Sequence, residues 1–428
     1  MRKLALGGAL ALISMNALAA DDFKVQLGGR MDTQYGVIHD SGNFRNTTPA
    51  QPSSSNKMRS NGLVTDSRID VNIDATSDKG FKYGGSIRLF ADTSLPVNSS
   101  PFYGDQNKVY IESNKIGRFE FGNTPGAPDL LELDIDNFEV GTYGVNGYWS
   151  TWLADKSYKW SSAFKDTKYA SLGVQSAQFI ATPVLFTNYS SNGYSNAPKV
   201  NYFTKPLDEI TIGLSYTPDL DSRGTVSGMS YANNVSSSDQ RGNPATFKNI
   251  YGLGVMLDKK FGDYGVKINF SGVAGQAKLK VLRDLRAYET GALFNYKSFK
   301  FGSTYGTWGN SLTFKANNTP GRKTFANYWT LGLGQELEKF GYSLTYLNSN
   351  KAGGLESLAA TALGGYTNTL QKLTDTSANN LKSMVLDLDY AIAPGFKAYV
   401  AGSKFRIKES GGQVDNGNLL ILGTRLLF

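Results

Sequence analysis

The chain has 428 residues, with 44 basic and 36 acidic side chains, one histidine and no cysteine. The lack of cysteine excludes a disulfide-stapled secreted scaffold and catalysis by a cysteine nucleophile. The positive charge is mild for this length, and no aromatic-basic motif accompanies it, so nucleic acid is not an expected partner. Glycine (47 residues), tyrosine (24) and phenylalanine (24) are abundant in a chain of low overall hydropathy. This composition is typical of a β-barrel with aromatic girdles outside and a polar interior.

The N-terminal segment has the order of features of a secretory signal. Arg2 and Lys3 precede an apolar run at 4–13, and small residues at Ala17 and Ala19 follow. We expect residues 1–19 to be a cleaved signal peptide and the mature chain to begin at Ala20. A buried N-terminal helix is the less favoured alternative. No later apolar run approaches 18 residues, and no change of composition divides the rest, so 20–428 is predicted to be one domain without a membrane-spanning helix.

Alternation with period two is the dominant pattern in the remainder of the chain. In the first segment, Leu27 and Met31 alternate with Arg30 and Asp32. We predict sixteen strands, at 25–38, 67–77, 81–92, 108–114, 117–123, 199–204, 209–217, 249–260, 265–275, 286–297, 299–308, 327–337, 341–348, 382–392, 396–407 and 417–428. In the last of these strands the alternation is imperfect, because both faces carry leucine or isoleucine.

Short and long connections largely alternate between these strands, which a soluble sandwich gives no reason to expect. Outer-membrane barrels have short periplasmic turns and long external loops. The fold class is therefore all-β, a sixteen-stranded antiparallel transmembrane β-barrel that is wide enough to enclose an aqueous channel. An eighteen-stranded barrel is the alternative, if 177–190 pairs with 157–168 as two further strands.

Several segments together resemble the Gram-negative general porin family. They are the first strand directly after the signal, the Gly-Arg-Phe-Glu-Phe-Gly junction at 117–122, the hairpin at 200–218 and the terminal Phe428. The resemblance covers essentially the whole mature chain. It implies a homotrimer in the outer membrane of a Gram-negative bacterium, in contact with lipid and lipopolysaccharide. It also implies a third loop folded into the lumen and Phe428 as an assembly signal, although the long 123–198 segment departs from the family pattern.

Two charged sets are the candidate functional residues of such a pore. The basic set lies on the polar faces of early strands and of the last strand, which closure places beside the first; arginine stays charged at any relevant pH. Its members are Arg30, Arg68, Arg88, Arg118 and Arg425. Ordinary solvation, or pairing with Asp32, Asp70 and Asp74, is the alternative reading of these residues.

The acidic set begins the third loop and has no basic residue among its members. They are Asp129, Glu132, Asp134, Asp136 and Glu139. If the loop folds inward, these carboxylates face the arginines and create a transverse field in the constriction. A solvated external loop is one alternative. A Ca²⁺ site at 134–137 is a weaker one, because the spacing matches no complete calcium loop; no metal or cofactor is expected.

An enzyme is not expected. The single histidine, His39, follows the first strand, and no nucleophile elbow, phosphate-binding loop or zinc spacing occurs. The favoured function is passive diffusion of ions and small hydrophilic solutes. A solute-specific channel stays open, because sugars stack on rings such as those of Tyr143, Tyr148, Trp149, Trp152 and Trp160. A structural barrel or adhesin is the third possibility.

The same alternation predicts what faces lipid. Apolar positions expected to point outward include Leu27, Val71, Ile73, Ile212 and Leu388. Tyrosines near strand ends are expected to form two belts, where rings lie in the interface and hydroxyls reach water. They are Tyr35, Tyr216, Tyr251, Tyr288, Tyr296, Tyr328, Tyr342, Tyr346 and Tyr390.

Overall fold

The computed structural model describes residues 23–41, 60–91, 102–133, 138–147, 152, 197–205, 209–220, 247–277, 283–311, 325–352, 378–408 and 414–428. The strands in these ranges are β1 (Lys24–Asp40), β2 (Asn61–Thr76), β3 (Lys82–Ala91), β4 (Phe102–Ser113), β5 (Gly117–Asn123), β6 (Pro198–Phe203), β7 (Ile210–Asp219), β8 (Phe247–Phe261), β9 (Tyr264–Ala277), β10 (Leu285–Tyr296), β11 (Phe299–Gly309), β12 (Ala326–Glu336), β13 (Phe340–Ala352), β14 (Ala378–Ala393), β15 (Phe396–Lys408) and β16 (Val414–Leu427). Two helical turns, α1 (Ala127–Leu130) and η2 (Gly144–Asn146), lie between β5 and β6. Neither is long and apolar enough to cross a membrane.

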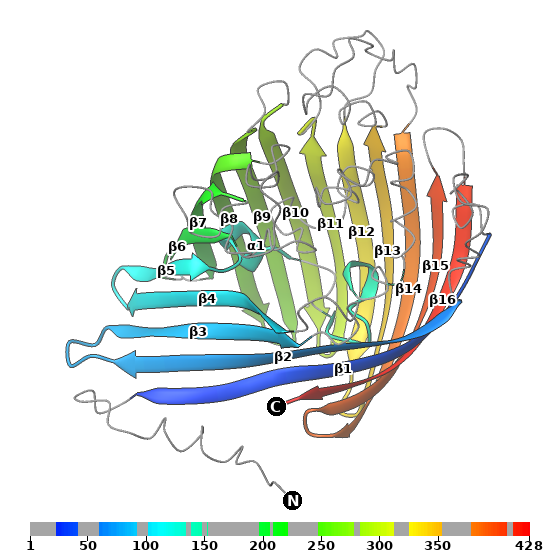
Figure 1. Ribbon diagram of the computed structural model, residues 1–428, viewed down its shortest axis with the longest axis horizontal. Coiled ribbons are helices and arrows are strands. Elements are labelled where there is room, and N and C mark those ends of the chain that lie inside the picture. The colour runs from blue at the N-terminus through cyan, green and yellow to red at the C-terminus, as the bar shows by residue number, and fades with distance from the viewer. Residues whose placement is uncertain are drawn as a thin grey trace, which may run out of the picture.

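All sixteen strands form one closed antiparallel sheet (Figure 1). Each strand pairs with its neighbours in sequence, and β1 pairs with β16 along a register that includes Asp32 opposite Arg425. The predicted sixteen-stranded barrel is confirmed. The eighteen-stranded alternative is wrong, because β5 pairs directly with β6, with Arg118 opposite Phe203. The segment 177–190 lies outside the described residues.

Several strands are longer than predicted at the end of the barrel where the long connections lie. β2 begins at Asn61 rather than at residue 67, β4 at Phe102 rather than at 108, and β14 at Ala378 rather than at 382. Backbone pairing continues there because ladder hydrogen bonds do not need an apolar face. The alternating pattern in the sequence marks only the part of a strand that has one apolar face. The predicted strands therefore end where the apolar outer surface of the barrel ends.

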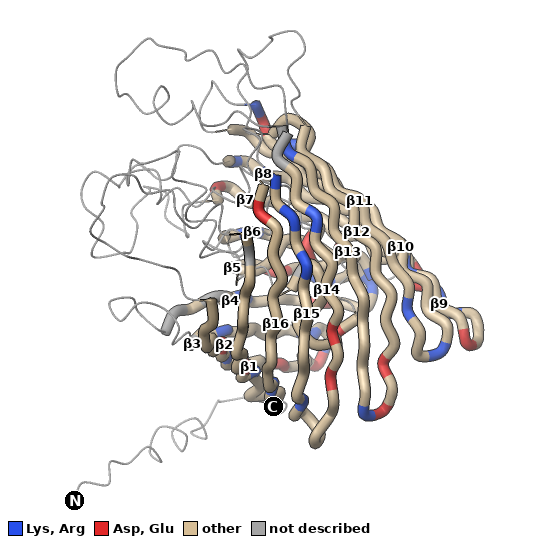
Figure 2. The backbone as a smooth tube through the Cα atoms, turned by 90° about the vertical axis from the view of Figure 1, so that its right-hand side faces the viewer, with Lys and Arg blue, Asp and Glu red and all other residues tan. Residues whose placement is uncertain are grey.

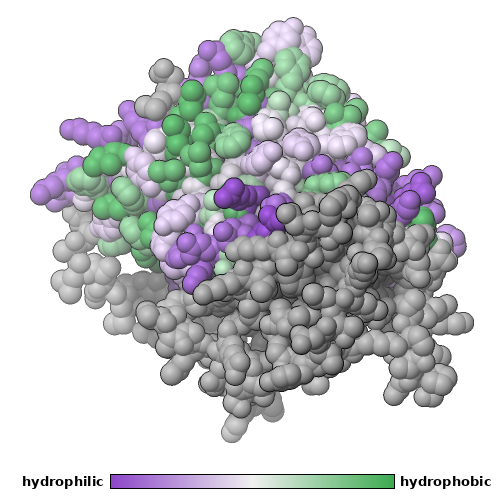
Figure 3. All heavy atoms as spheres, turned by 90° about the horizontal axis from the view of Figure 1, so that it is seen from above, coloured by the Kyte–Doolittle hydropathy of each residue, from purple (hydrophilic) through white to green (hydrophobic). Residues whose placement is uncertain are grey.

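The outer wall of the barrel is apolar. Leu27 has an exposed fraction of 62% and Leu388 of 45%, whereas Asp32 and Asp387 on the alternate face are buried. Contiguous hydrophobic areas appear on the surface in the space-filling view (Figure 3). In the side view, the strands β9–β16 lie next to one another and form one wall of the barrel (Figure 2). The outward orientation predicted for Leu27 and Leu388 is therefore confirmed.

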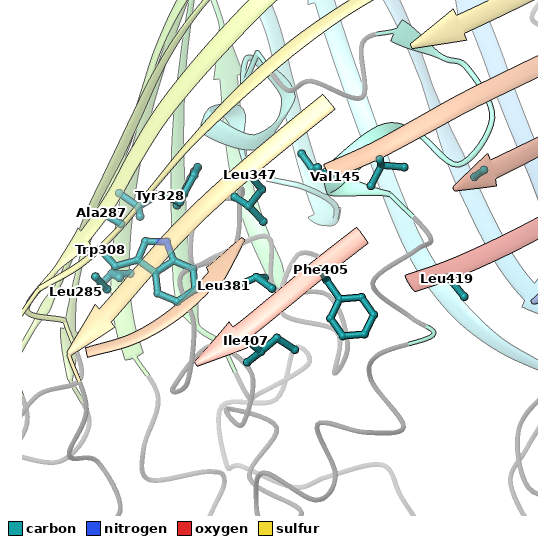
Figure 4. Close-up of a cluster of buried hydrophobic side chains, with 14 of the residues drawn as sticks. Val145, Leu285, Ala287, Trp308, Tyr328, Leu347, Leu381, Phe405, Ile407 and Leu419 are labelled. Atoms are coloured by element: carbon teal, nitrogen blue, oxygen red, sulfur yellow. The ribbon is translucent and has the colours of Figure 1, made fainter. Parts of the chain in front are cut away.

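The inner face is not polar throughout. Leu285, Leu347, Phe405, Ile407 and Leu419 belong to a buried cluster on the inner side of the later strands (Figure 4). Leu419 and its neighbour on the same face, Ile421, explain the imperfect alternation of β16, because their side chains pack inside the barrel while Leu420 and Leu422 remain exposed outside.

Aromatic residues pair near both ends of the outer wall. Tyr216 and Tyr251 pair at the end with long connections, with ring centroids 5.1 Å apart, and Tyr264 and Tyr296 stack at the other end at 4.8 Å. Tyr328 is an exception to the predicted outward set.

Tyr328 points inward, where it is buried and its hydroxyl donates to Glu289. Its ring occupies the space that Gly306 leaves on β11, where an added Cβ would lie only 2.1 Å from the ring. Trp329, the next residue, faces outward in its place and packs against Tyr346. The prediction for Tyr328 used only its position near a strand end. Whether a side chain points inward or outward depends instead on the alternation of residues along the strand.

Candidate functional site

A row of arginines and aspartates lies on the inner wall of β1, β2 and β3. Arg30 stands opposite Arg68 in the strand register, and each cation has an acidic partner on the wall itself. Arg30 pairs with Asp66, while Asp70 accepts from Arg88 Nε at 2.6 Å and lies 3.3 Å from Arg68 Nε. The adjacent aspartates offset the repulsion between the three guanidinium groups, so these groups can lie close together. These three predicted residues are brought together, in company with carboxylates.

Arg425, on β16, lies next to this wall because the barrel closes between β16 and β1, but its side chain is buried. Its Nε donates to Asp32 Oδ2 at 2.7 Å, and only 3% of its side chain is exposed. Tyr399 also donates to Asp32. The guanidinium carbon lies 4.2 Å from the ring centroid of Tyr143, a residue of the third loop. Arg425 therefore connects the loop to the closing seam of the barrel.

Arg118 lies apart from the other four arginines, at the short-turn end of β5. It donates to Glu120 at 2.8 Å and to Glu112 at 3.3 Å, and its guanidinium covers the ring of Tyr110 at 3.8 Å. In the register of β4, Arg118 is opposite Glu112 whereas Arg88 is opposite Gln106. Those positions are six residues apart, or about 20 Å along the strand.

The third loop begins inside the barrel, with α1 against the inner faces of β7, β8 and β9. Ser271 Oγ donates to the carbonyl oxygen of Pro128 at 2.8 Å, and Asn201 Nδ2 donates to that of Pro125 at 2.9 Å. Glycines on β7 and β8 leave room for the helix: a Cβ on Gly254 would lie 2.8 Å from the carbonyl oxygen of Ala127. The predicted folding of this loop into the lumen is confirmed for the described part.

The acidic set is spread along this loop. The Asp129 carboxylate accepts from the Gly126 N–H at 2.8 Å, at the start of α1. Glu132 is buried, whereas Glu139 is exposed and has a left-handed backbone, with φ of 52°. Asp134 and Asp136 lie outside the described residues, and with them the calcium alternative. Since α1 rests on β7–β9, it is on the opposite side of the closed sheet from β1.

A second anchor holds the loop where it reaches β13 and β14. Asp387 accepts from Thr142 N and Thr142 Oγ1, both at 2.7 Å, and from Gly144 N at 3.0 Å. Val145 N donates to Thr345 Oγ1 at 2.9 Å. Asp387 is fully buried, so these donors satisfy a carboxylate that would otherwise be costly to bury.

Trp152 marks where the loop reaches the first strands. Its Nε1 donates to Gln34 Oε1 at 3.2 Å. The indole lies over Gly36, where a Cβ would be 2.6 Å from the ring, and close to Gly62. Tyr148, Trp149 and Trp160 lie outside the described residues.

The loop anchors were not predicted. Neither Asp387 nor Thr345 is among the candidate residues named from the sequence. The available signal was a carboxylate on the inner face of a strand, across from Ser343 and Ala401 and with no basic residue in register with it. Such a carboxylate needs donors from elsewhere. His39 lies within β1, on its exposed face, rather than after the strand.

A closed barrel with an apolar outside, charged residues on its inner wall and a loop folded within it defines the class of outer-membrane β-barrel channels. The chain belongs to the Gram-negative porin family, whose model matches residues 5–410. The family and the fold imply location in the outer membrane.

Similar chains occur in Rickettsia. An uncharacterized protein of Rickettsia felis is 23% identical over 394 residues, which is 80% of each chain, and one of Rickettsia bellii is 22% identical over 490 aligned positions, which cover 100% of each. Among solved structures, a mutant porin of Rhodobacter blastica has a TM-score of 0.52 at 12% identity and covers 95% of this chain and 100% of its own. A loop-deleted OmpT, an outer membrane protein of Vibrio cholerae, gives the same values. Identities this low show the fold alone.

Proposed function

We propose that the protein is a general diffusion porin, a water-filled channel that passes ions and small hydrophilic solutes without chemistry. The observation that carries this proposal is the path of the third loop. Most of its described contacts are with the inner faces of β7–β9 and of β13–β14, and Trp152 reaches β1 and β2. The inner faces of β2–β5 carry partly exposed charged residues. A loop attached in this way narrows the lumen to a gap beside the charged wall.

The electrostatic part of the proposal concerns the two charged sets. Arg30, Arg68 and Arg88, with their aspartate partners, form one side of the passage, and Arg118 lies on the same wall nearer the short turns. We propose that the loop carboxylates form the other side: Asp129, Glu132 and Glu139 among the described residues, together with Asp134 and Asp136, which lie outside them. Opposed charges in a low-dielectric constriction orient water and disfavour apolar solutes, which gain nothing from the field. Arg425 contributes by holding Tyr143 rather than by meeting solutes.

A solute-specific channel with an aromatic slide has less support. Of the aromatic residues that suggested it, Trp152 packs on Gly36 and bonds to Gln34, and Tyr143 covers Arg425. These rings are engaged with the wall, which favours a structural role for both.

Export and assembly belong to the same proposal. We expect cleavage of the signal segment before Ala20 and assembly as a homotrimer in contact with outer-membrane lipid and lipopolysaccharide. The outer face of the early strands supports association, since it exposes large apolar side chains on successive strands. They are Leu63, Ile69, Ile87, Leu89, Val109, Ile111 and Phe121.

Planar-bilayer recording tests the channel. The purified protein is expected to give stepwise, unsaturated conductance that increases with salt. In a salt gradient, the double variant Arg68→Gln/Arg88→Gln is expected to shift the reversal potential toward cation preference. The shift should shrink between 0.1 M and 1 M salt, because the Debye length falls from about 10 Å to about 3 Å.

Lys259→Gln is the control variant, because Lys259 pairs with Glu209 at the short-turn end of β8, outside the passage. Absence of conductance would refute the channel, and saturation by one solute would favour the specific channel instead. An unchanged reversal potential in the double variant would mean that the two arginines do not line the passage.

A further inference from the structure

The outer wall carries a basic patch near the end with long connections, on β13, β14 and β15. The patch consists of four cations and three asparagines: Lys382, Lys404, Arg406, Lys408, Asn348, Asn350 and Asn380. Figure 2 shows basic residues gathered along the corresponding stretch of β14 and β15. Elsewhere on the described outer wall at this end, cations such as Arg286 on β10 stand singly.

The patch faces away from the lumen. Lys382 is exposed while Leu381 beside it is buried, and Arg406 is exposed between the buried residues Phe405 and Ile407. Side chains alternate between the two faces of a strand. Since the buried partners belong to the cluster inside the barrel, the cations point outward.

The patch lies directly beside the apolar belt. Lys382 is opposite Asn348 on β13 and Arg406 on β15. Two residues further along β14, on the same face, stands Met384, followed by Leu386; both are exposed. That step is about 7 Å along the strand. The cations are therefore at the height where hydrocarbon gives way to lipid headgroups at the outer surface.

The patch is arranged for an anion. Six of its residues line a cavity of about 380 Å³: Asn348, Asn350, Asn380, Lys382, Arg406 and Lys408. Asn380 Nδ2 donates to Asn348 Oδ1 at 2.9 Å and to Asn350 Oδ1 at 2.8 Å. These bonds engage the carbonyl oxygens of both amides and leave their N–H groups as donors. Among the described residues, no carboxylate lies within ion-pair distance of Lys382, Arg406 or Lys408.

We propose that this patch binds the phosphate of a phosphorylated lipid headgroup in the outer leaflet. Lysine, arginine and amide donors around one cavity match phosphate oxygens, and basic pockets beside a membrane bind anionic headgroups. Free phosphate offers the same oxygens. The lipid is preferred because the patch faces the membrane at headgroup height, whereas a dissolved anion would pass on the lumen side. The inference rests on the proposed placement in the outer membrane.

The test measures binding of a bis-phosphorylated glycolipid to the detergent-solubilised barrel by native mass spectrometry. The triple variant Lys382→Gln/Arg406→Gln/Lys408→Gln is expected to weaken binding at least about ten-fold. Arg286→Gln, a lone outward cation at the same end, is the matched control and should stay within about two-fold of the parent. The dephosphorylated glycolipid should bind the parent about as weakly as the phosphorylated lipid binds the triple variant.

Two further arms separate the possible failures. Inorganic phosphate in millimolar excess is added as competitor: retention of the lipid supports the proposal, whereas complete displacement would overturn it in favour of a free-anion site. Single-channel conductance of the triple variant in uncharged phosphatidylcholine bilayers should equal that of the parent. If conductance is normal and lipid affinity is unchanged by the triple substitution, the lipid site is refuted while the channel stands.

Discussion

At the scale of single residues, two buried aspartates on the inner wall hold the third loop and the seam. Asp387 accepts three hydrogen bonds from Thr142 and Gly144 of the loop. Asp32 accepts from Arg425, whose guanidinium lies under the ring of Tyr143. A buried carboxylate with several charge-assisted acceptor bonds is a strong local attachment. The position of the loop in the lumen therefore depends on a few side chains of the later strands.

The first prediction concerns that attachment. Asp387→Ala leaves three buried donors without their acceptor, at a cost of about 1–3 kcal/mol for each one that finds no other partner. Single-channel recordings should show increased current noise and additional conductance levels, because the loop moves between attached and detached positions. The barrel itself should still fold, since no ladder hydrogen bond is removed. The same strand and face offer Ser383→Ala as control; equal noise in both variants would contradict the anchor.

Residue directions were more predictable than residue partners. Alternation alone gave the inward direction of Arg30, Arg68 and Arg88, because parity in a strand decides the face. It gave neither their ion pairs with Asp66 and Asp70 nor the covered state of Arg425, because these depend on the register between strands and on a distant loop. Tyr328 was predicted to face outward because it lies near a strand end, but the alternation of residues along the strand turns it inward.

At the scale of elements, α1 is held by the shape of its support. Gly213, Gly252 and Gly254 on adjacent strands form a flat area without side chains, and Ala127 and Pro128 pack on it. These glycines are not among the candidate residues named from the sequence. This flat glycine area could not be predicted. It is formed by β7 and β8, which follow the loop in the chain and lie beside each other only in the folded sheet.

Enlarging one of these glycines should move the helix. A Cβ on Gly254 would lie 2.8 Å from the Ala127 carbonyl oxygen and 3.0 Å from Leu131 Cβ, so Gly254→Val should displace α1 toward the lumen. The expected result is a lower single-channel conductance with the barrel still folded. Gly402→Val serves as control, because a Cβ at Gly402 meets no atom within 4 Å. If both variants conduct like the parent, α1 does not border the passage.

At the scale of the whole molecule, the apolar belt fixes how the barrel lies in a bilayer. Met384, Leu386 and Leu388 succeed one another on the outer face of β14, between the cations at one end and Tyr390 at the other. The sequence predicted this architecture well, because nearly every strand repeats the same alternation and the count of strands follows from it. The strand ends next to the long connections escaped prediction, since no apolar face marks them.

Introducing a charge into the belt tests the orientation. Leu386 stands near the middle of β14, so Leu386→Arg should reduce the free energy of unfolding from lipid vesicles by about 2–4 kcal/mol. Asn418→Arg, on the outer face of β16 close to the long connections, should cost only about 0–1 kcal/mol. Urea titration followed by tryptophan fluorescence measures both. Equal effects at the two positions would mean that the belt is not where the bilayer lies.

The seam between β1 and β16 also constrains how the protein reaches its native state. Asp32 and Arg425, which meet across it, are separated by 393 positions in the chain. A sheet that lacks β16 has two open edges, and unpaired edges invite association with other chains. Contacts this distant form slowly, because loop closure precedes them. We therefore expect synthesis and export to finish before the barrel folds, and the unfolded chain to need protection from aggregation during that delay.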